Sequence, residues 1–216
     1  MTKILKPSIE AISEAVHILL NDGIVIIPTI RWYMFCCKAE NQECIERIFN
    51  AKERSLNKKP LFILPNKLLS KLFFKIENET EMLIEKLWPG ELTLLLPWVD
   101  QNIASKYLAF DQTSALAISP PMLFGEIACS ASIPLAATTV NTSCSLDKDH
   151  LGPALSIEEV LSFIKKSKIK IDIIIDGGIC PAFNHTTIID CSEGQYPKII
   201  REGFVHERAI KIALSN

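Results

Sequence analysis

Apolar positions recur along the chain at two spacings, which together predict alternating helices and strands. A spacing of three to four residues, typical of one helix face, predicts helices over 8–22, 40–50, 77–87, 122–130, 156–166 and 204–214. Short apolar runs, many of them β-branched, predict strands over 24–28, 61–65, 91–98, 114–119, 133–139, 170–176, 186–191 and 198–202. Ser8 is placed to cap the first helix, and Ser156 with Glu159 forms a capping box for the fifth.

The order of these elements predicts one α/β domain with a mixed sheet. Helices and strands are interspersed through the chain, without a long polar linker, a low-complexity block or an internal repeat. Helical connections favour parallel pairing of some strands, whereas the short connection between the last two strands permits antiparallel pairing.

Composition is that of an ordinary globular protein and excludes disorder of the whole chain. Of 216 residues, 48% are hydrophobic and 22% are charged, which allows a sizeable core. The 23 basic and 25 acidic residues nearly cancel, so bulk charge predicts neither a nucleic-acid binder nor a membrane binder, although a local basic patch stays open. The N-terminus lacks a signal-peptide core and no apolar run approaches the roughly 18 residues of a membrane span, so we expect a cytoplasmic protein.

Cysteine and glycine usage narrows the chemistry. The seven cysteines are scattered without a C-x-x-C pair, and the four histidines complete no zinc pattern. We therefore expect buried reduced thiols and no metal site built from protein side chains. Only eight glycines occur, about half the usual share of roughly 7%, so few positions allow bare backbone to approach a ligand.

Polar residues cluster where the predicted strands end, which is where open α/β sheets place ligand sites. The segment 52–60 carries four cations that suit phosphate oxygens, or else forms a solvated basic loop. The segment 137–144 is rich in hydroxyls that hold phosphate or carboxylate, or else bond to their own turn. Arg201, among apolar neighbours, is either an ion-pair partner or an anion ligand. Trp-Pro-Gly at 88–90 predicts a rigid turn, in which proline fixes φ and glycine allows a positive φ, with a role in shape rather than chemistry.

The chain lacks the sequence patterns of covalent catalysis and of phosphate-loop enzymes. Neither a Ser-His-Asp nor a Cys-His arrangement nor a Walker sequence is present. An enzyme of this sequence would work by positioning charged substrates and stabilising developing charge.

Taken in order, seven segments resemble the YrdC/Sua5 family. That family shows PTxTxYGL after a strand, then KxR with a later KPL, WPGxLT, PLxATSANxSG, a D-x-G strand, STVxD and RxG. The matching stretches are GIVIIPTIRWYMF, KERSLNKKPL, LWPGELTLLLP, PLAATTVNTSC, IIIDGG, HTTIID and REG. Each motif is weak alone, and the resemblance depends on their common order.

The resemblance implies a fold and a reaction. The fold is a single YrdC-like domain over 8–205, a twisted, open, mixed α/β sheet with a concave basic face, followed by a helical extension over 206–216. By the same resemblance we expect the short, single-domain form, without the extra C-terminal domain of longer Sua5 proteins. The reaction joins L-threonine, bicarbonate and ATP into threonylcarbamoyl-AMP and releases pyrophosphate, with Mg²⁺ bridging phosphates. A partner complex then transfers the group to adenosine 37 of tRNA, so tRNA or a tRNA-modification complex is the possible partner.

Roles for individual residues follow from the same resemblance. Lys52 and Arg54 match KxR, and we expect them to bind the ATP phosphates as the catalytic cations. Further nucleotide contacts are expected from Thr139, Asn141, Ser143 and Arg201. The expected amino-acid and carbamate contacts are Thr29, Arg31, Tyr33, Thr186 and Thr187.

Departures from the family pattern gather in the amino-acid half of the motifs. They are Ile30 and Arg31 within PTxTxYGL, Met34-Phe35 for its Gly-Leu, Ile118 or Ser119 for the arginine of a VRxP strand, Cys144 for the last glycine of SANxSG, and one extra residue before KPL. Three hypotheses stay open: an active threonylcarbamoyl-AMP synthase, a paralogue that makes a carbamoyl- or other acyl-adenylate, and a non-catalytic RNA- or nucleotide-binding protein. Arg31 either replaces the charge of the missing arginine or selects a different amine.

Overall fold

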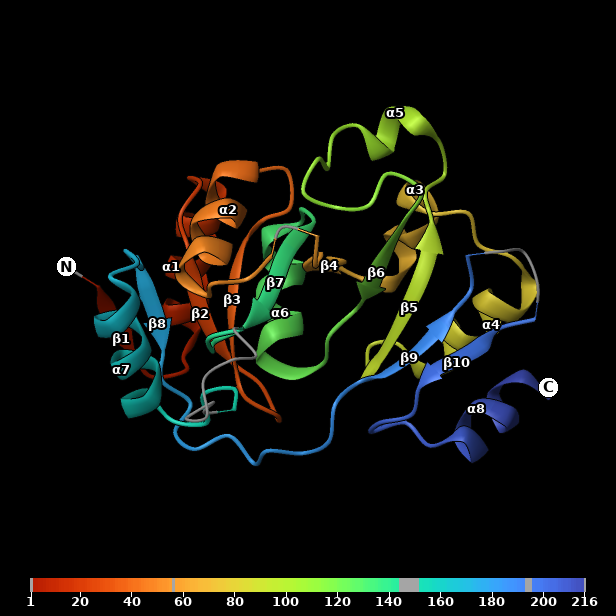
Figure 1. Cartoon of the computed structure of the whole chain (residues 1–216). Coiled ribbons are helices and arrows are strands. Elements are labelled where there is room, and N and C mark those ends of the chain that lie inside the picture. Colours follow the sequence, from red (N-terminus) through yellow and green to blue (C-terminus); the bar gives the residue numbers. More distant parts are fainter. Residues whose placement is uncertain (1, 56, 144–151, 193–195, 216) are drawn as a thin grey trace.

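One mixed sheet runs through the part of the chain that the computed structural model describes, residues 2–55, 57–143, 152–192 and 196–215. Within it, ten strands follow the order β1-β8-β2-β3-β7-β4-β6-β5-β9-β10, and the sheet stays open because β1 and β10 do not pair. The N-terminus lies beside β1 and the C-terminus beside α8 at the opposite end of the molecule (Figure 1). The open α/β sheet agrees with the sequence prediction, while a concave, basic face stays a prediction.

The strand pairing is mixed, as expected. Parallel neighbours are β1–β8, β8–β2, β4–β6 and β5–β9, and the other neighbours are antiparallel, including the final pair β9–β10. The strands are β1 (Lys3–Leu5), β2 (Val25–Pro28), β3 (Tyr33–Lys38), β4 (Leu61–Ile63), β5 (Leu92–Pro97), β6 (Ser114–Ile118), β7 (Leu135–Thr139), β8 (Ile173–Ile175), β9 (Thr187–Asp190) and β10 (Lys198–Arg201).

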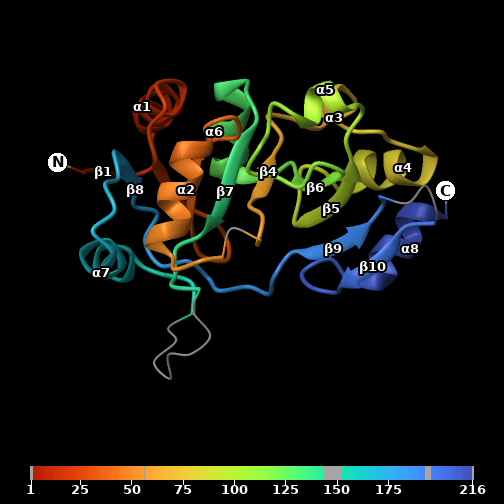
Figure 2. The same ribbon diagram turned by 45° about the horizontal axis from the view of Figure 1, so that its top comes forward.

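Helices cover both faces of the sheet. Figure 2 shows α1 and α6 along one side and α7 on the other. The Ser8 side chain caps α1 by accepting from the Ala11 amide at 3.1 Å, as the sequence predicts. The helices are α1 (Ile9–Leu20), α2 (Gln42–Ala51), α3 (Ser70–Phe73), α4 (Asn78–Leu87), α5 (Gln101–Ala104), α6 (Met122–Ala131), α7 (Ile157–Ser167) and α8 (Glu207–Leu214), with the 3₁₀ turn η1 (Lys67–Leu69).

Strand β2 is buried on both faces, which confirms the interpretation of its apolar run. Ile24 and Ile26 pack into the core under α2 and α7, while Val25 and Ile27 pack into the core under α1 and α6. Successive side chains point to opposite faces of a strand, so a run without polar positions fits a strand covered on both sides.

Strand β3 was not predicted from the sequence, and it forms a hairpin with β2. The turn is tight, because the Thr29 amide donates to the Trp32 carbonyl at 3.1 Å. Its residues include none of the Asn-Gly or Asp-Gly pairs that identify a hairpin in a sequence. Consequently the segment 28–33 is a tight turn between two paired strands.

The remaining unpredicted elements are β1, α3, α5 and η1, each three or four residues long. Segments of this length are too short to show a helical or strand period. The three residues of β1 lie before the start of the predicted domain, yet they extend the same sheet by pairing with β8.

Gly90 corrects one expectation about the Trp-Pro-Gly turn. It does not adopt a positive φ, and among the described glycines Gly178 is the one that does, at +81°. A Cβ on Gly90 would lie 2.3 Å from the Leu87 carbonyl oxygen. The turn therefore needs glycine for close backbone approach, not for left-handed geometry.

The described cysteines are unpaired, and five of the six are buried. The exception is Cys129, which is exposed and corrects the expectation of uniformly buried thiols. Cys144 lies outside the described residues. In the same part of the chain, no helix has the length and apolar character to cross a bilayer.

Helix α8 packs on the body of the protein rather than standing apart from it. It contacts α4, and its Ile210 and Ala213 side chains enter the core. The Lys86 ammonium donates to the Ala213 carbonyl at 3.0 Å. These contacts bring the predicted extension against the sheet end that carries β9 and β10 (Figure 1).

Candidate functional site

Two clusters, made mostly of predicted site residues and joined by Glu91 and His185, which were not predicted, lie at the same end of the β3–β7 pair. We call Lys52, Arg54, Thr139, Asn141 and Ser143 the lysine cluster, and Arg31, Glu91, His185, Thr186 and Arg201 the arginine cluster. The Val140 amide donates to the Tyr33 carbonyl at 3.0 Å. Because Arg31 precedes Tyr33 by two residues and Asn141 follows Val140 directly, this bond holds the two segments side by side.

Lys52 is the centre of the lysine cluster and is completely buried. It follows α2, and its ammonium donates to the Asn141 carbonyl and to Asn141 Oδ1, both at 2.8 Å, and also to the Thr139 carbonyl. An ammonium has three donor hydrogens, so these oxygens use all of them. In this conformation Lys52 shapes the loop after β7 and offers no free donor to a phosphate.

The charge of Lys52 is sensitive to its surroundings. Burial, followed by the nearby Arg54 guanidinium, lowers the pKa of Lys52 to about 7. The ammonium therefore titrates close to neutral pH, where its loss would weaken the hydrogen bonds that hold the loop.

The loop after β7 is also held by its own side chains. Thr139 Oγ1 donates to Asn141 Oδ1 at 2.5 Å, and Asn141 Nδ2 donates to the Thr142 carbonyl at 2.9 Å. The Ser143 amide donates to the Lys52 carbonyl at 2.7 Å. The segment is therefore a turn held by its own side chains, which was one of the two interpretations. The other, ligand binding, stays open because the half-buried Asn141 and Ser143 residues are partly accessible.

Arg54 is half-buried beside the same loop. Its Nη2 donates to the Lys59 carbonyl at 3.0 Å, and its guanidinium lies 5.1 Å from the centre of the Phe49 ring. Its Nε is buried without a partner in the described residues. Burial lowers the pKa of Arg54, which stays charged because an arginine pKa is far above neutral.

Three of the predicted amino-acid contacts use their hydroxyls inside the fold. Tyr33 donates to the Gly178 carbonyl at 2.8 Å, and Thr187 donates to the Val205 carbonyl at 2.7 Å. Thr29 donates to the Trp32 carbonyl at 2.8 Å and accepts the amides that close the turn. Their role as ligand contacts stays a prediction, and in this conformation they position the backbone around the site.

Arg31 and Glu91 form a buried ion pair between the β2–β3 turn and the Trp-Pro-Gly turn. Arg31 Nε lies 3.1 Å from Glu91 Oε2, and both side chains are more than nine-tenths buried. The contact lacks the alignment of a hydrogen bond, since both atoms are buried without a hydrogen-bond partner in the described residues. Burial lowers the pKa of Arg31 and raises that of Glu91, which the Arg31 charge partly opposes.

Arg201 and Thr186 complete the arginine cluster. Arg201 Nη2 donates to the Thr186 carbonyl at 3.0 Å and to its hydroxyl at 3.2 Å, while the Thr93 hydroxyl donates to Thr186 Oγ1 at 3.0 Å. His185 lies with its ring 4.9 Å from the Trp32 ring. Burial, then Arg201 and Arg31, lowers the pKa of His185, so this cluster carries an excess of positive charge.

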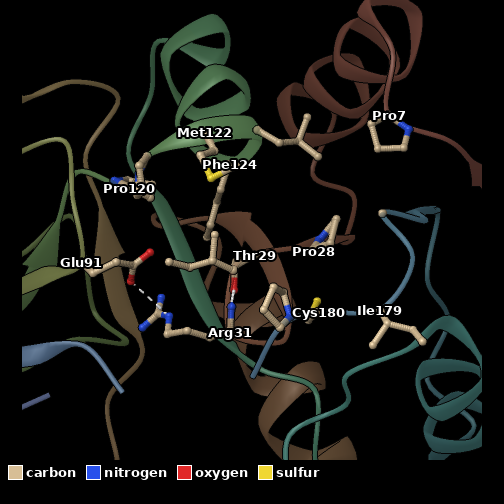
Figure 3. A pocket seen from close by; sticks show the side chains of 15 residues that line it. Pro7, Pro28, Thr29, Arg31, Glu91, Pro120, Met122, Phe124, Ile179 and Cys180 are labelled. Atoms are coloured by element: carbon tan, nitrogen blue, oxygen red, sulfur yellow. Dashed lines mark hydrogen bonds and ion pairs between the residues drawn. The ribbon is translucent and has the colours of Figure 1, made fainter. Parts of the chain in front are cut away.

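A pocket of about 380 Å³ opens beside Arg31 and Glu91. Figure 3 shows the two charged side chains facing each other at one side of it, with Met122 and Phe124 from α6 above. Thr29, Pro28 and Cys180 also line the pocket. Its volume lies at the lower end of the range for small-molecule sites, roughly 300–1,000 Å³.

Glu91 is a site residue that the sequence analysis missed. It occupies the variable position of WPGxLT, and a motif comparison assigns no role to a variable position. An acidic residue next to that buried turn was the available signal, because buried carboxylates normally need a cationic partner.

The described residues contain no cluster of three or more His, Cys, Asp or Glu that would hold a metal ion. Mg²⁺ commonly binds through the phosphates of its substrate and few protein groups. Binding of Mg²⁺ together with a nucleotide stays a prediction.

Comparison with known proteins identifies relatives across almost the whole chain. The model of the Sua5/YciO/YrdC family, described as "Telomere recombination", matches residues 17–203. Threonylcarbamoyl-AMP synthase of Bacillus subtilis is 24% identical, covering 94% of this chain and 56% of its own length. Threonylcarbamoyl-AMP synthase of Psychromonas ingrahamii is 24% identical, covering 90% of this chain and 98% of its own length.

Solved structures show the same fold. The crystal structure of P. abyssi Sua5 complexed with L-threonine superimposes with a TM-score of 0.79 at 24% identity, covering 100% of this chain and 61% of that one. The chain thus spans little more than half the length of the Bacillus subtilis and P. abyssi relatives.

Proposed function

Because this chain belongs to the Sua5/YciO/YrdC family, we propose that it is an ATP-dependent, adenylate-forming enzyme of the threonylcarbamoyl-AMP synthase type. It would join an amino acid, with L-threonine as the first candidate, to bicarbonate and ATP and release pyrophosphate. The observation that carries the proposal is the lysine cluster beside the arginine cluster. Together they place cations and amide groups at one edge of the sheet, as a negatively charged nucleotide requires.

The cations of the two clusters have different proposed roles: some bind the nucleotide phosphates and one positions a loop. Arg54 and Arg201 have guanidinium groups that are only partly buried, so they are the proposed phosphate ligands. Lys52 holds the loop that presents Asn141 and Ser143, which makes it a positioning residue in this conformation. A carbamate oxygen attacks the α-phosphorus of ATP, and the bond from that phosphorus to the bridging oxygen breaks as pyrophosphate leaves.

Threonine as the amine is supported by the names of two relatives and by the L-threonine in P. abyssi Sua5. We extend the proposal to the use of the product in tRNA modification, with tRNA or a tRNA-modification complex as acceptor, Mg²⁺ bound to the phosphates, and the cytoplasm as the compartment. These parts follow from the family and not from a contact in this molecule.

Pyrophosphate release tests the proposal. The protein, supplied with Mg²⁺, ATP, bicarbonate and L-threonine, should release pyrophosphate only when all are present, with Arg201→Ala reducing the rate. A folded protein that binds ATP yet shows no release with any of the twenty standard amino acids would refute it.

A related adenylate from another reaction is the second candidate, and the loss of one arginine from the family pattern is the observation that raises it. The place of the family's VRxP arginine is taken by Ile118, buried in the core, or by Ser119, also buried, while Arg31 supplies a guanidinium from the β2–β3 turn. Pyrophosphate release with carbamoyl phosphate and without an amino acid would support this candidate over the first.

A further inference from the structure

The guanidinium of Arg31 has donors that the fold does not use. Its side chain is buried beside the pocket, and it forms an ion pair with Glu91 but no side-chain hydrogen bond to the described residues. Arginine carries five N–H donors in a planar fork that matches a carboxylate. Buried N–H donors in proteins normally have hydrogen-bond acceptors. The Arg31 donors that have none among the described residues therefore point to a ligand with acceptor oxygens.

Glu91 has an acceptor oxygen that lacks a hydrogen-bond donor. Its Oε2 is buried and accepts no hydrogen bond from the described residues, although Arg31 Nε lies 3.1 Å away. A carboxylate has about four acceptor sites, so a donor from a ligand would complete it. The pair is therefore suited to bind one molecule that has an acceptor group for Arg31 and a donor group for Glu91.

The charges around Arg31 and Glu91 suit a ligand that carries one negative and one positive group. Arg31 lies near Arg201 as well as Glu91, and the pKa of Arg31 reflects both. His185 faces the same arginines, and its lowered pKa favours the neutral ring at neutral pH. A carboxylate meets two cations here, while a positively charged amine has the Glu91 carboxylate as its partner.

The pocket beside the pair is apolar apart from these charges. Its other lining includes Pro28, Ile30, Phe124 and Ile179, and Figure 3 shows Phe124 and Ile179 on its sides. Thr29 is the lining residue with a hydroxyl, and that hydroxyl is already committed to the turn. A ligand side chain in this pocket therefore finds apolar contacts and no free hydroxyl.

We propose that Arg31 and Glu91 together bind the zwitterionic head of a free α-amino acid, with Arg31 on its carboxylate and Glu91 on its ammonium group, while its side chain enters the apolar pocket. This inference rests on the proposed function, because it names the amine that the adenylate-forming site takes. It also predicts that valine, which has a methyl group in place of the threonine hydroxyl, binds at least as tightly as threonine.

The same geometry disfavours carbamoyl phosphate as the substrate of this pocket. That compound is an anion without an ammonium group, so it brings no cationic group to the buried Glu91 carboxylate and is repelled by it. The arginine cluster thus separates the first candidate function from the second.

Calorimetry with small ligands tests the proposal on the unaltered protein, with and without a non-hydrolysable ATP analogue. L-valine is compared with isovalerate, which lacks the ammonium group, and with isobutylamine, which lacks the carboxylate. Each should bind at least about tenfold more weakly than valine, because each loses a charge-assisted contact. Equal affinities, tighter binding of carbamoyl phosphate, or no valine binding with or without the analogue would overturn the proposal.

A variant pair assigns the ammonium contact to Glu91. Glu91→Gln should weaken valine binding at least about tenfold without weakening isovalerate binding, because isovalerate has no ammonium group for Glu91, so that the preference for valine is lost. Glu126→Gln, an exposed position on α6, is the matched control and should keep the wild-type preference. A Glu91→Gln protein that retains the preference contradicts the assignment, and if it does not fold, the ligand series decides.

The binding experiment and the pyrophosphate-release experiment can contradict the two proposals independently. Valine or threonine binding without pyrophosphate release would contradict the proposed function and leave the inference standing. Pyrophosphate release driven by carbamoyl phosphate alone, with no amino-acid binding, would contradict the inference.

Discussion

The Lys52 ammonium binds both oxygens of Asn141, the backbone carbonyl and the side-chain Oδ1, each at 2.8 Å. A residue at the end of α2 thereby fixes a loop that begins 87 residues later at Thr139. The buried lysine and the loop form one unit, so the loop should depend on a side chain that no ligand need touch.

Lys52→Met should weaken ATP binding by about tenfold or more, because the freed oxygens of Thr139 and Asn141 lose their buried donor. Calorimetry measures the affinity. Hydrogen exchange without ATP separates positioning from direct contact: we expect faster exchange of the 139–143 amides in the variant. Lys58→Met, at an exposed lysine nearby, is the control for both measurements. Unchanged exchange together with weaker ATP binding would instead mean that Lys52 contacts the phosphates directly.

The stability of the protein should depend on pH through Lys52. Its pKa is about 7 in the fold, against about 10.4 in an unfolded chain. The cost of burying the charged ammonium is fully present below pH 7 and is relieved as the pH rises, because the unfolded chain then binds one more proton than the folded chain.

Relative to Lys52→Met, the free energy of unfolding of the wild type should therefore rise between about pH 7.5 and 9.5, by on the order of 1 kcal/mol per pH unit. Urea unfolding at several pH values measures it. Taking the difference between the two proteins removes the titration of cysteines and tyrosines, which both share. Parallel pH curves for the two proteins would show that Lys52 keeps an ordinary pKa.

Arg201→Ala should weaken ATP binding by about tenfold while leaving stability within about 1 kcal/mol, because the exposed guanidinium contacts only Thr186 in the described structure. Arg208→Ala, at an exposed arginine of α8, should change neither property. Equal ATP affinities for the two variants would remove Arg201 from the nucleotide site.

Thr187→Val should destabilise the protein by about 1–3 kcal/mol, because the buried hydroxyl donates to the Val205 carbonyl and accepts the amides of Gly203 and Val205. Thermal unfolding measures the loss. Thr138→Val is the matched control, since this buried threonine on β7 has no side-chain hydrogen bond to the described residues. A loss of amino-acid binding without a loss of stability would restore Thr187 to the ligand contacts that the family resemblance implies.

The sequence predicted those elements whose periodicity is long enough to detect. The runs that became β2, β7 and α7 carry a consistent apolar pattern, and side-chain caps such as Ser8 mark the helix starts. Strand β3 went unpredicted because its turn lacks the glycine and asparagine that identify a hairpin, although its apolar run over 33–37 is itself typical of a buried strand.

The candidate site was also predicted only in part from the sequence. Motif order identified residues that the structure brings together, such as Lys52 with Asn141 and Thr186 with Arg201. It did not show that Lys52 and Thr187 are buried and committed to backbone groups, since burial depends on packing between distant segments. Nor did it reveal Glu91, whose partner Arg31 lies 60 residues earlier in the chain.

Product analysis tests the central claim most directly. The protein is incubated with Mg²⁺, ATP, an amino acid and ¹³C-bicarbonate, and the products are examined by mass spectrometry. We predict an adenylate that contains the amino acid and one labelled carbon, formed together with pyrophosphate. Pyrophosphate without label in any AMP-containing product, or no such product from protein that binds both ATP and the amino acid, would contradict the account.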